Sequence, residues 1–237
     1  MSYFLTEENL EVARPARLKG EEAAHLLLSR RIKPGEIIKA QGPDGRRFFC
    51  RVAALNKREV EIVPAEPGPI PPPPRAAVTL YQAVLSQAPL EMVLQKATEL
   101  SVAEIVLFNA ERTATKLAPE KFAEKVGRWR KILQEAAKQS ERQFPPVLGF
   151  QNDLFAAIEK VVGDGVVLVF DGRGEPPRAG TVLGRLDAVI GPEGGWSPAE
   201  FDRLKRLPNV RLVSLGPLVL RADTAAAAAL AVCQNLF

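Results

Sequence analysis

The sequence predicts an α/β protein with a mainly parallel sheet, preceded by a smaller all-β domain, and three observations support this prediction. Short strand-like runs separated by tight turns occupy residues 36–63, and seven prolines follow within residues 64–74. After Arg75 the pattern changes to strands that alternate with helices, which is typical of a parallel sheet covered by helices. We therefore expect domains at residues 1–70 and 75–237 joined by a stiff proline-rich spacer, the alternative for that segment being a ligand for a proline-binding domain.

The composition excludes several classes of protein. Of 237 residues, 46% are hydrophobic, which is enough for a packed core. No apolar run reaches the roughly eighteen residues of a membrane span, and Met1–Glu8 lacks the basic start of a signal peptide, so we expect a cytoplasmic protein. Two distant cysteines, Cys50 and Cys233, and a single histidine argue against a disulfide scaffold, a zinc cluster and a thiol or serine hydrolase. No metal is expected.

The first domain reads as a small β-barrel. A short helical pattern at Gly20–Ser29 precedes strand-like runs at Glu36–Ala40, Arg47–Ala54 and Glu59–Val63. Turn sequences at 42–45 and 56–58 separate these runs. Residues 25–58 carry nine basic and two acidic side chains, although the whole chain has a net charge of only +4. Such a cluster attracts phosphate, the alternative being an ordinary solvated face.

The second domain begins with a regular alternation of elements. We expect a strand at Ala76–Leu85, a helix at Pro89–Leu100, a strand at Ile105–Phe108, a long amphipathic helix at Glu120–Ser140 and a strand at Val166–Phe170. The segment Asp171–Gly174 reads as a loop after that last strand. It lacks the third glycine of a dinucleotide fingerprint, so a dinucleotide-dependent oxidoreductase is weakly supported.

The C-terminal fifty residues contain two loops that follow short apolar runs. Ala188–Ile190 and Val210–Leu215 read as buried strands, and each ends at a glycine. The segment Gly191–Gly195 exposes backbone without Cβ cover, and Ser197-Pro-Ala-Glu200 predicts the capped start of a helix. A flat ligand can lie against such a backbone, although a tight turn without a ligand would use the same glycines.

The second loop brings three polar side chains to the start of a helix. After Gly216-Pro217 and an apolar stretch, Arg221, Asp223 and Thr224 combine a cation, a carboxylate and a hydroxyl. A helix N-terminus also offers unpaired N–H donors. Either Asp223 or Thr224 could instead serve only as the helix cap.

Together these motifs resemble a known family. Ile190-Gly-Pro-Glu-Gly-Gly195, followed by Leu215-Gly-Pro-Leu-Val-Leu-Arg221 and Asp223-Thr-Ala225, resembles the paired signature of the RsmE family. These are SPOUT-superfamily methyltransferases that methylate N3 of a uridine in 16S ribosomal RNA of the small subunit. The resemblance implies a PUA-like β-barrel that binds RNA, a SPOUT methyltransferase domain with a C-terminal trefoil knot, and a homodimer. His25–Arg30 resembles the entry motif of the barrel, where His25 is expected to be structural, the alternative being an RNA contact.

The resemblance also implies which residues form the site. It makes S-adenosyl-L-methionine the cofactor, with Arg221 and Asp223 as the catalytic residues. The residues expected to bind the cofactor lie on the two loops and are Gly191, Pro192, Glu193, Gly194, Gly195, Leu215, Gly216, Leu220 and Thr224. The residues expected to contact ribosomal RNA are basic or follow family motifs, and are Arg30, Arg31, Arg47, Arg112, Gln139 and Arg142.

Two departures from the family pattern leave an alternative open. Ala222 stands where the family commonly has threonine, and Asp223 stands where it has glutamate. The shorter acid puts a direct role for that carboxylate in doubt. The alternative function is a catalytically inactive RNA-binding or ribosome-binding protein of the same fold.

Overall fold

The computed structural model describes residues 3–159, 165–178 and 185–236, and its contacts divide the chain into two compact units. The β unit comprises residues 1–72 together with 137–144, and the α/β unit comprises residues 73–136 and 145–237. The division therefore falls within the proline-rich segment. Nothing in the sequence pattern indicated that residues 137–144 pack with the first unit.

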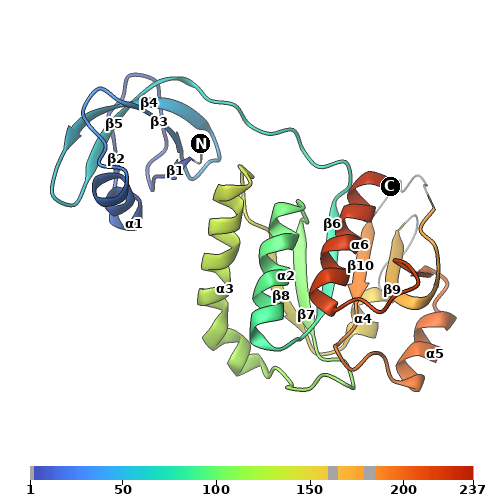
Figure 1. Cartoon of the computed structure of the whole chain (residues 1–237). Helices are drawn as coiled ribbons and strands as arrows, with labels where there is room; N and C mark the ends of the chain where they lie inside the picture. Colours follow the sequence, from blue (N-terminus) through green and yellow to red (C-terminus); the bar gives the residue numbers. More distant parts are fainter. Residues whose placement is uncertain (1–2, 160–164, 179–184, 237) are drawn as a thin grey trace. The chain divides into compact units, whose positions relative to one another are not determined.

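The β unit is built on one five-stranded sheet (Figure 1). In spatial order the strands are β1 (Phe4–Leu5), β3 (Ile37–Gln41), β4 (Arg47–Leu55), β5 (Val60–Pro67) and β2 (Ala16–Leu18). The three predicted strands, β3 to β5, are confirmed and pair antiparallel. The two edge strands span only two and three residues, too few for a periodic pattern to show. A helical segment follows β2, with α1 at Gly20–Ala24 and a π-helical turn, η1, at His25–Ser29.

The proline-rich spacer begins later than predicted. We expected it from Pro64, but β5 continues to Pro67, which pairs with Phe48 of β4. Pro64 pairs with Cys50 where the register of the two strands shifts. A sheet tolerates proline at such irregularities because no ladder hydrogen bond from its nitrogen is needed there. The expectation of a spacer over residues 64–67 was therefore wrong.

The α/β unit contains a six-stranded sheet in which every pair of neighbouring strands is parallel, as predicted. In spatial order the strands are β11 (Val210–Val213), β9 (Val166–Glu175), β10 (Leu186–Ile190), β6 (Val78–Ala83), β7 (Glu104–Phe108) and β8 (Val147–Gln151). Helices cover both faces of this sheet (Figure 1). One face packs against α2 (Gln87–Glu99), α3 (Pro119–Gln139) and α6 (Ala222–Leu236), and the other against α4 (Leu154–Ile158) and α5 (Pro198–Arg206).

Several details of the α/β unit differ from the predictions. Strand β8 and helix α4 were not predicted, and the expected loop at Asp171–Gly174 is part of β9. That strand continues because Glu175 pairs with Val213 of β11 after an irregularity in the ladder. The amphipathic prediction for α3 is confirmed, since Trp129 and Leu133 are buried in the core.

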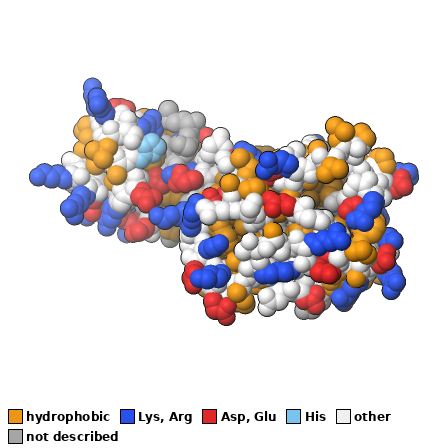
Figure 2. Space-filling view, turned by 60° about the horizontal axis from the view of Figure 1, so that its bottom comes forward, with side chains coloured by type: hydrophobic (Ala, Val, Ile, Leu, Met, Phe, Trp, Pro, Cys, Tyr) orange, Lys and Arg blue, Asp and Glu red, His pale blue; other side chains and the backbone are white. Residues whose placement is uncertain are grey.

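Neither sign of charge dominates the face of the molecule seen in Figure 2. Basic and acidic side chains are interspersed over the face seen in Figure 2, in keeping with 32 basic and 28 acidic residues. Within the described ranges, no helix is both long enough and apolar enough to span a membrane. A nucleic-acid site must therefore be sought in local clusters of charge rather than in the net charge.

Candidate cofactor cavity

A cavity of about 840 Å³ lies at the carboxyl ends of β9 and β10. Parallel strands present their carboxyl ends at one edge of the sheet, so the loops that follow them meet there. Three segments line the cavity: Phe170–Arg173, residues of 190–196, and residues 215–223. The second and third of these are the two glycine-containing loops. We call them the first loop (residues 190–196) and the second loop (residues 214–221).

The first loop is fixed by contacts with its surroundings. Gly195 has a φ of 68°, a conformation that favours glycine, and its N–H donates to the carbonyl of Pro192 at 2.9 Å. The indole of Trp196 lies against Gly191, where an added Cβ would come within 3.0 Å of the ring. The same indole stacks on Phe108 at 6.0 Å between ring centroids. At the tip of the loop, the hydroxyl of Ser86 donates to the carboxylate of Glu193 at 3.0 Å.

The predicted capping box after the first loop is confirmed, and its carboxylate has a further contact. The N–H of Glu200 donates to the Ser197 hydroxyl at 3.2 Å, and the N–H of Ser197 donates to one Glu200 oxygen at 2.9 Å. The other Glu200 oxygen accepts the N–H of Glu111 at 2.7 Å. Gly194 lies against Arg112, the residue that follows Glu111, since a Cβ added at Gly194 would be 3.1 Å from the carbonyl oxygen of Arg112. Glu200 therefore holds the loop after β7 beside the first loop.

The second loop is more exposed. Gly216 has a φ of 136°, and its carbonyl accepts the Ser214 hydroxyl at 3.1 Å. Leu218 and Val219 are 79% and 101% exposed, although both are apolar. The guanidinium of Arg221 lies 3.7 Å from the carboxylate of Asp223, and its side chain is 77% exposed. These side chains are available to a ligand or to another protein surface.

The segment Phe170–Arg173, which we call the third wall of the cavity, was not predicted as part of a site. Arg173 donates from Nε to one oxygen of Asp171 at 2.7 Å and from a terminal nitrogen to the other at 2.9 Å. The guanidinium also lies over the ring of Phe201 at 3.4 Å. The hydrogen bond from Arg173 lowers the pKa of Asp171 from its ordinary value, while burial acts in the opposite direction. Nothing in the composition of Asp171–Gly174 indicated that this segment borders the cavity.

Most residues predicted for the cofactor site come together in this cavity. Both predicted catalytic residues, Arg221 and Asp223, line it. Gly194 and Thr224 are not in its lining, and Thr224 donates its N–H to Asp223 at 2.8 Å. The predicted cofactor-binding residues that line the cavity are Gly191, Pro192, Glu193, Gly195, Leu215, Gly216 and Leu220. The lining residues that sequence reasoning missed include Pro89, Trp196 and residues 170–173.

The residues predicted to contact RNA are divided between the two units. Arg112 belongs to the α/β unit, and the other five belong to the β unit. Arg30, Arg31, Arg112 and Gln139 are exposed, whereas Arg142 is partly buried and donates to the carbonyl of Phe144 at 2.6 Å. The exposed His25 packs its ring 5.7 Å from that of Phe4.

Arg47 differs from the other predicted RNA contacts because it is buried. Its side chain donates to Gln41 at 2.7 Å and to the carbonyl of Glu141 at 2.8 Å, and it lies over the ring of Tyr3. With 3% exposure, Arg47 fastens residues 137–144 to the β unit. Its position in a basic stretch of sequence did not reveal this structural role.

Metal ligands and reactive thiols are not gathered at the cavity. Over the part of the chain that the structure describes, no three His, Cys, Asp or Glu side chains lie close enough to hold a metal ion. Both cysteines are buried, and burial raises the pKa of Cys233 to about 12. That thiol is therefore protonated at neutral pH and is a weak nucleophile.

Comparisons with known proteins identify the family. Residues 71–234 match the RNA methyltransferase domain family, and residues 18–65 match the RNA methyltransferase PUA domain family. The chain is 30% identical to ribosomal RNA small subunit methyltransferase E of Bacillus subtilis, covering 94% of this chain and 91% of that protein. It is 31% identical to the protein of that name from Mycobacterium tuberculosis, covering 91% and 84% respectively.

Solved structures give the same result. A ribosomal RNA small subunit methyltransferase E from Neisseria gonorrhoeae, bound to S-adenosyl methionine, has a TM-score of 0.87 at 28% identity over 100% of this chain and 98% of that one. A Legionella pneumophila protein in complex with the same cofactor has a TM-score of 0.82 at 26% identity, covering 98% and 96%. The resemblance inferred from the two loop motifs is confirmed. The chain belongs to the ribosomal RNA small subunit methyltransferase E family of RNA methyltransferases.

Proposed function

We propose that this protein transfers a methyl group from S-adenosylmethionine to N3 of a uridine in the ribosomal RNA of the small subunit. One observation carries the proposal: both signature loops line one cavity in a chain whose relatives are methyltransferases. The similar Neisseria gonorrhoeae enzyme was solved with S-adenosyl methionine. We expect the protein to act in the cytoplasm, where its RNA substrate is found.

The cavity fits a ligand that is held mainly through main-chain atoms. An added Cβ at Gly195 or at Gly216 would meet nothing within 4 Å, so the backbone faces open space at both positions. We assign the cofactor to residues 191–195 of the first loop and to Leu215, Gly216 and Leu220 of the second, with Thr224 beside them. In this assignment the adenine faces Leu215, Leu220 and backbone amides, because a flat aromatic ring needs an apolar surface with a few polar partners.

Positioning contributes more to this reaction than acid–base catalysis. When bound, S-adenosylmethionine supplies an electrophilic methyl group on its sulfonium centre. Holding two reactants in line is worth roughly 7–11 kcal/mol, whereas general acid–base catalysis adds about 3–5 kcal/mol. Main-chain loops that fix the geometry therefore account for most of the expected acceleration.

Arg221 supplies a cation at the place where negative charge must be stabilised. Uracil N3 is an imide nitrogen that gives up its proton to water before it accepts a methyl group, and the charge then spreads to the carbonyl oxygens. We assign Arg221 to these oxygens, because a guanidinium stays charged and donates several hydrogen bonds. Asp223, at 3.7 Å from Arg221, orients that guanidinium. This role requires a carboxylate close to Arg221 and does not depend on the length of the acidic side chain. Aspartate can therefore fill it in place of glutamate.

The finer features of the family are also part of the proposal. We infer a SPOUT-type domain with a trefoil knot in the C-terminal segment and a homodimer in which two copies complete the sites. The exposure of Leu218 and Val219 supports a partner surface at the second loop, since exposed apolar side chains in a cluster mark interaction sites. The small side chains Ala225–Ala229 of α6 allow close helix packing.

The RNA-binding part of the proposal uses four exposed residues and the partly buried Arg142, drawn from both units. We assign RNA contacts to Arg30, Arg31, Gln139 and Arg142 of the β unit, taken as an RNA-binding PUA-like domain, and to Arg112 of the α/β unit. Arg47 is omitted because its guanidinium is committed to the fold of the β unit.

Two measurements test the proposed function. Isothermal titration calorimetry should detect one molecule of S-adenosylmethionine bound per chain. Mass mapping of ribosomal RNA should show one methylated uridine that disappears in a deletion strain and returns when the gene is restored. A protein that binds RNA without binding S-adenosylmethionine would instead support the inactive alternative suggested by Ala222 and Asp223.

A further inference from the structure

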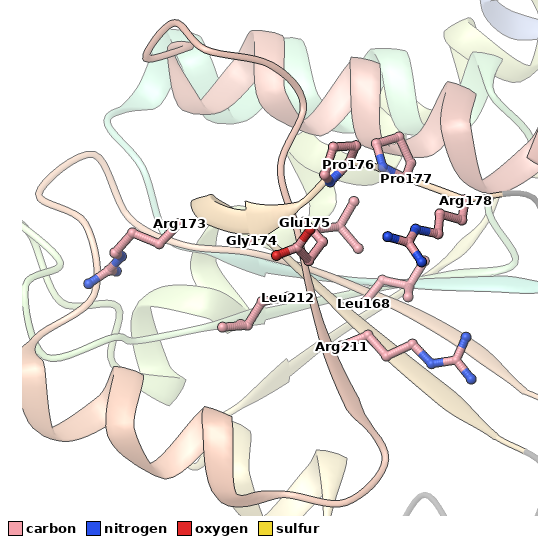
Figure 3. A pocket seen from close by; sticks show the side chains of 10 residues that line it. Leu168, Arg173, Gly174, Glu175, Pro176, Pro177, Arg178, Arg211 and Leu212 are labelled. Atoms are coloured by element: carbon pink, nitrogen blue, oxygen red, sulfur yellow. The ribbon is translucent and has the colours of Figure 1, made fainter.

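A second cavity, of about 520 Å³, lies over β9 and β11 in the α/β unit (Figure 3). Its floor is apolar and includes Leu168, which is 1% exposed, together with Pro176 and Pro177. Two exposed arginines, Arg178 and Arg211, line its rim. In Figure 3 their guanidinium groups extend to the same side of the cavity, with Leu168 between them. A cationic rim and an apolar floor together suit one nucleotide, with its phosphate at the rim and its ribose or base against the floor.

The two guanidinium groups have no anionic partner in the described structure. Neither Arg178 nor Arg211 forms an ion pair or a side-chain hydrogen bond with another described residue. Glu175 also lines the cavity, but no ion pair joins its carboxylate to either arginine. Among the residues that the structure describes, their charge is therefore available to a ligand, and guanidinium groups favour phosphate because their planar N–H fork matches its oxygens.

This second cavity adjoins the cofactor cavity. Arg173 lines both, and its own charge is neutralised by Asp171. The wall continues through Gly174, where an added Cβ would lie 2.5 Å from the backbone of Leu212 and Val213. Gly174 thus packs directly on the backbone of β11, and the residues that follow it, 175–178, line the second cavity. Because Arg173 borders both cavities, the second cavity lies on the path of a strand whose target base enters the cofactor cavity.

We propose that Arg178 and Arg211 form a phosphate-binding subsite that holds the RNA backbone next to the target uridine, with a ribose or base edge resting on Pro176 and Pro177. This inference rests on the proposed function and adds a substrate contact to it. Phosphate contacts fix the register of a nucleic acid, and a base that is methylated on its pairing edge must leave its neighbours. Holding the adjacent phosphate would fix the position from which the uracil turns toward Arg221.

The test compares two double variants that remove the same charge. R178Q/R211Q removes the subsite, and K125Q/R130Q removes two exposed cations from α3, neither of which has a described side-chain partner. Binding of transcribed small-subunit ribosomal RNA is measured over a series of salt concentrations. We expect R178Q/R211Q to weaken binding about tenfold or more, and to reduce the magnitude of the salt slope by about 1.4 to 1.8 relative to wild type. The control should keep the wild-type slope and affinity.

A conservative variant and two further measurements separate the possible outcomes. R178K/R211K keeps both charges, so it should retain the salt slope and most of the affinity. Equal RNA binding by R178Q/R211Q and the control would overturn the subsite. So would a change in its sedimentation behaviour or in its affinity for S-adenosylmethionine, because either would assign these arginines to assembly or to the cofactor cavity. If wild type fails to incorporate methyl groups while its RNA binding still depends on these arginines, the proposed function fails and the subsite stands.

Discussion

The two loops that line the cofactor cavity are held in different ways. The first loop is fixed by Trp196, which packs on Gly191 and Phe108, and by the hydrogen bond between Ser86 and Glu193. The second loop has hydrogen bonds between Ser214 and Gly216, within the loop itself, and leaves Val219 fully exposed. Both loops contain a glycine with positive φ, so their backbone chemistry is similar. What differs is the number of side chains from elsewhere in the α/β unit that hold each loop.

This difference assigns a separate task to each loop. A loop that is fixed before a ligand arrives pays little ordering entropy on binding, whereas an exposed loop must be ordered by what it binds. We therefore expect the first loop to determine the geometry of the cofactor cavity. We expect the second loop, which carries Arg221, to be ordered by the ligands that it binds.

The largest expected effect is on stability, from removal of the side chain that fixes the first loop. Trp196 is 4% exposed, so Trp196→Ala should lower the free energy of unfolding by about 3–5 kcal/mol. The matched change in the second loop, Val219→Ala, should cost within about 0.5 kcal/mol because that side chain is fully exposed. Urea unfolding followed by circular dichroism measures both. Similar losses in the two variants would contradict the contrast between the loops.

The next effect concerns activity rather than stability. Arg221→Ala should lower kcat about a hundredfold, or roughly 2.7 kcal/mol, because a cationic donor to the developing negative charge is lost. Its stability and its affinity for S-adenosylmethionine should match wild type, since the side chain is 77% exposed. Arg221→Lys should recover part of the rate by keeping the charge. Methyl incorporation by Arg221→Ala at the wild-type rate would remove Arg221 from the proposed mechanism.

The sequence predicted those parts of the fold that depend on local patterns. Those strands of the parallel sheet that contain β-branched runs could be recognised, and so could the amphipathic face of α3. Both could be recognised because hydrophobic periodicity reports burial directly. Strand β8, Val147–Gln151, mixes apolar residues with Gly149 and ends in a polar residue, and α4 has only five residues. Strands as short as β7 (Glu104–Phe108) were recognised, so β8 was missed because of its composition, whereas five residues are too few for helical periodicity in α4. Both are specified by the neighbours they pack against.

The predicted site residues show the same distinction between features set by local sequence and features set by contacts with residues far along the chain. The two loop motifs are contiguous in sequence, so their glycines, Arg221 and Asp223 could be found without a structure. Arg173 was missed because its place beside the cavity depends on the pairing of Glu175 with Val213, far along the chain. Arg47 was placed on the RNA surface by its local charge, but its partner is the carbonyl of Glu141, 94 residues away. Local charge cannot indicate that such a partner exists.

A smaller effect tests how the loop after β7 is held beside the first loop. Glu200→Gln leaves only one acceptor oxygen for two backbone donors, those of Ser197 and Glu111. We expect a loss of about 1 kcal/mol in the free energy of unfolding. Glu193→Gln is the control, because its carboxylate accepts one exposed hydrogen bond from Ser86, and it should cost within about 0.5 kcal/mol. If Glu200→Gln costs no more than Glu193→Gln, the bridge to Glu111 does not stabilise this arrangement.

The smallest effect depends on pH and concerns the third wall of the cavity. Because Arg173 lowers the pKa of Asp171 in the folded state, the ionised carboxylate stabilises the protein above the unfolded pKa of about 4. That contribution is lost as the pH falls further, through the lowered pKa. Asp171→Asn should therefore cost about 0.5–1 kcal/mol at pH 6, a range that allows for solvent around the half-exposed guanidinium.

Unfolding measured at pH 6 and near pH 2.5 separates this charge effect from packing. The stability difference between wild type and Asp171→Asn should shrink at the lower pH, because the carboxylate of Asp171 gains a proton as the pH falls toward its lowered pKa. In an Arg173→Ala background the substitution at Asp171 should have little effect at either pH, because the partner that lowers the pKa is gone. A difference that persists unchanged at low pH would assign the role of Asp171 to uncharged packing rather than to the ion pair. The third wall would then resemble the contact of Trp196 with Gly191 and Phe108, which carries no charge and does not respond to pH.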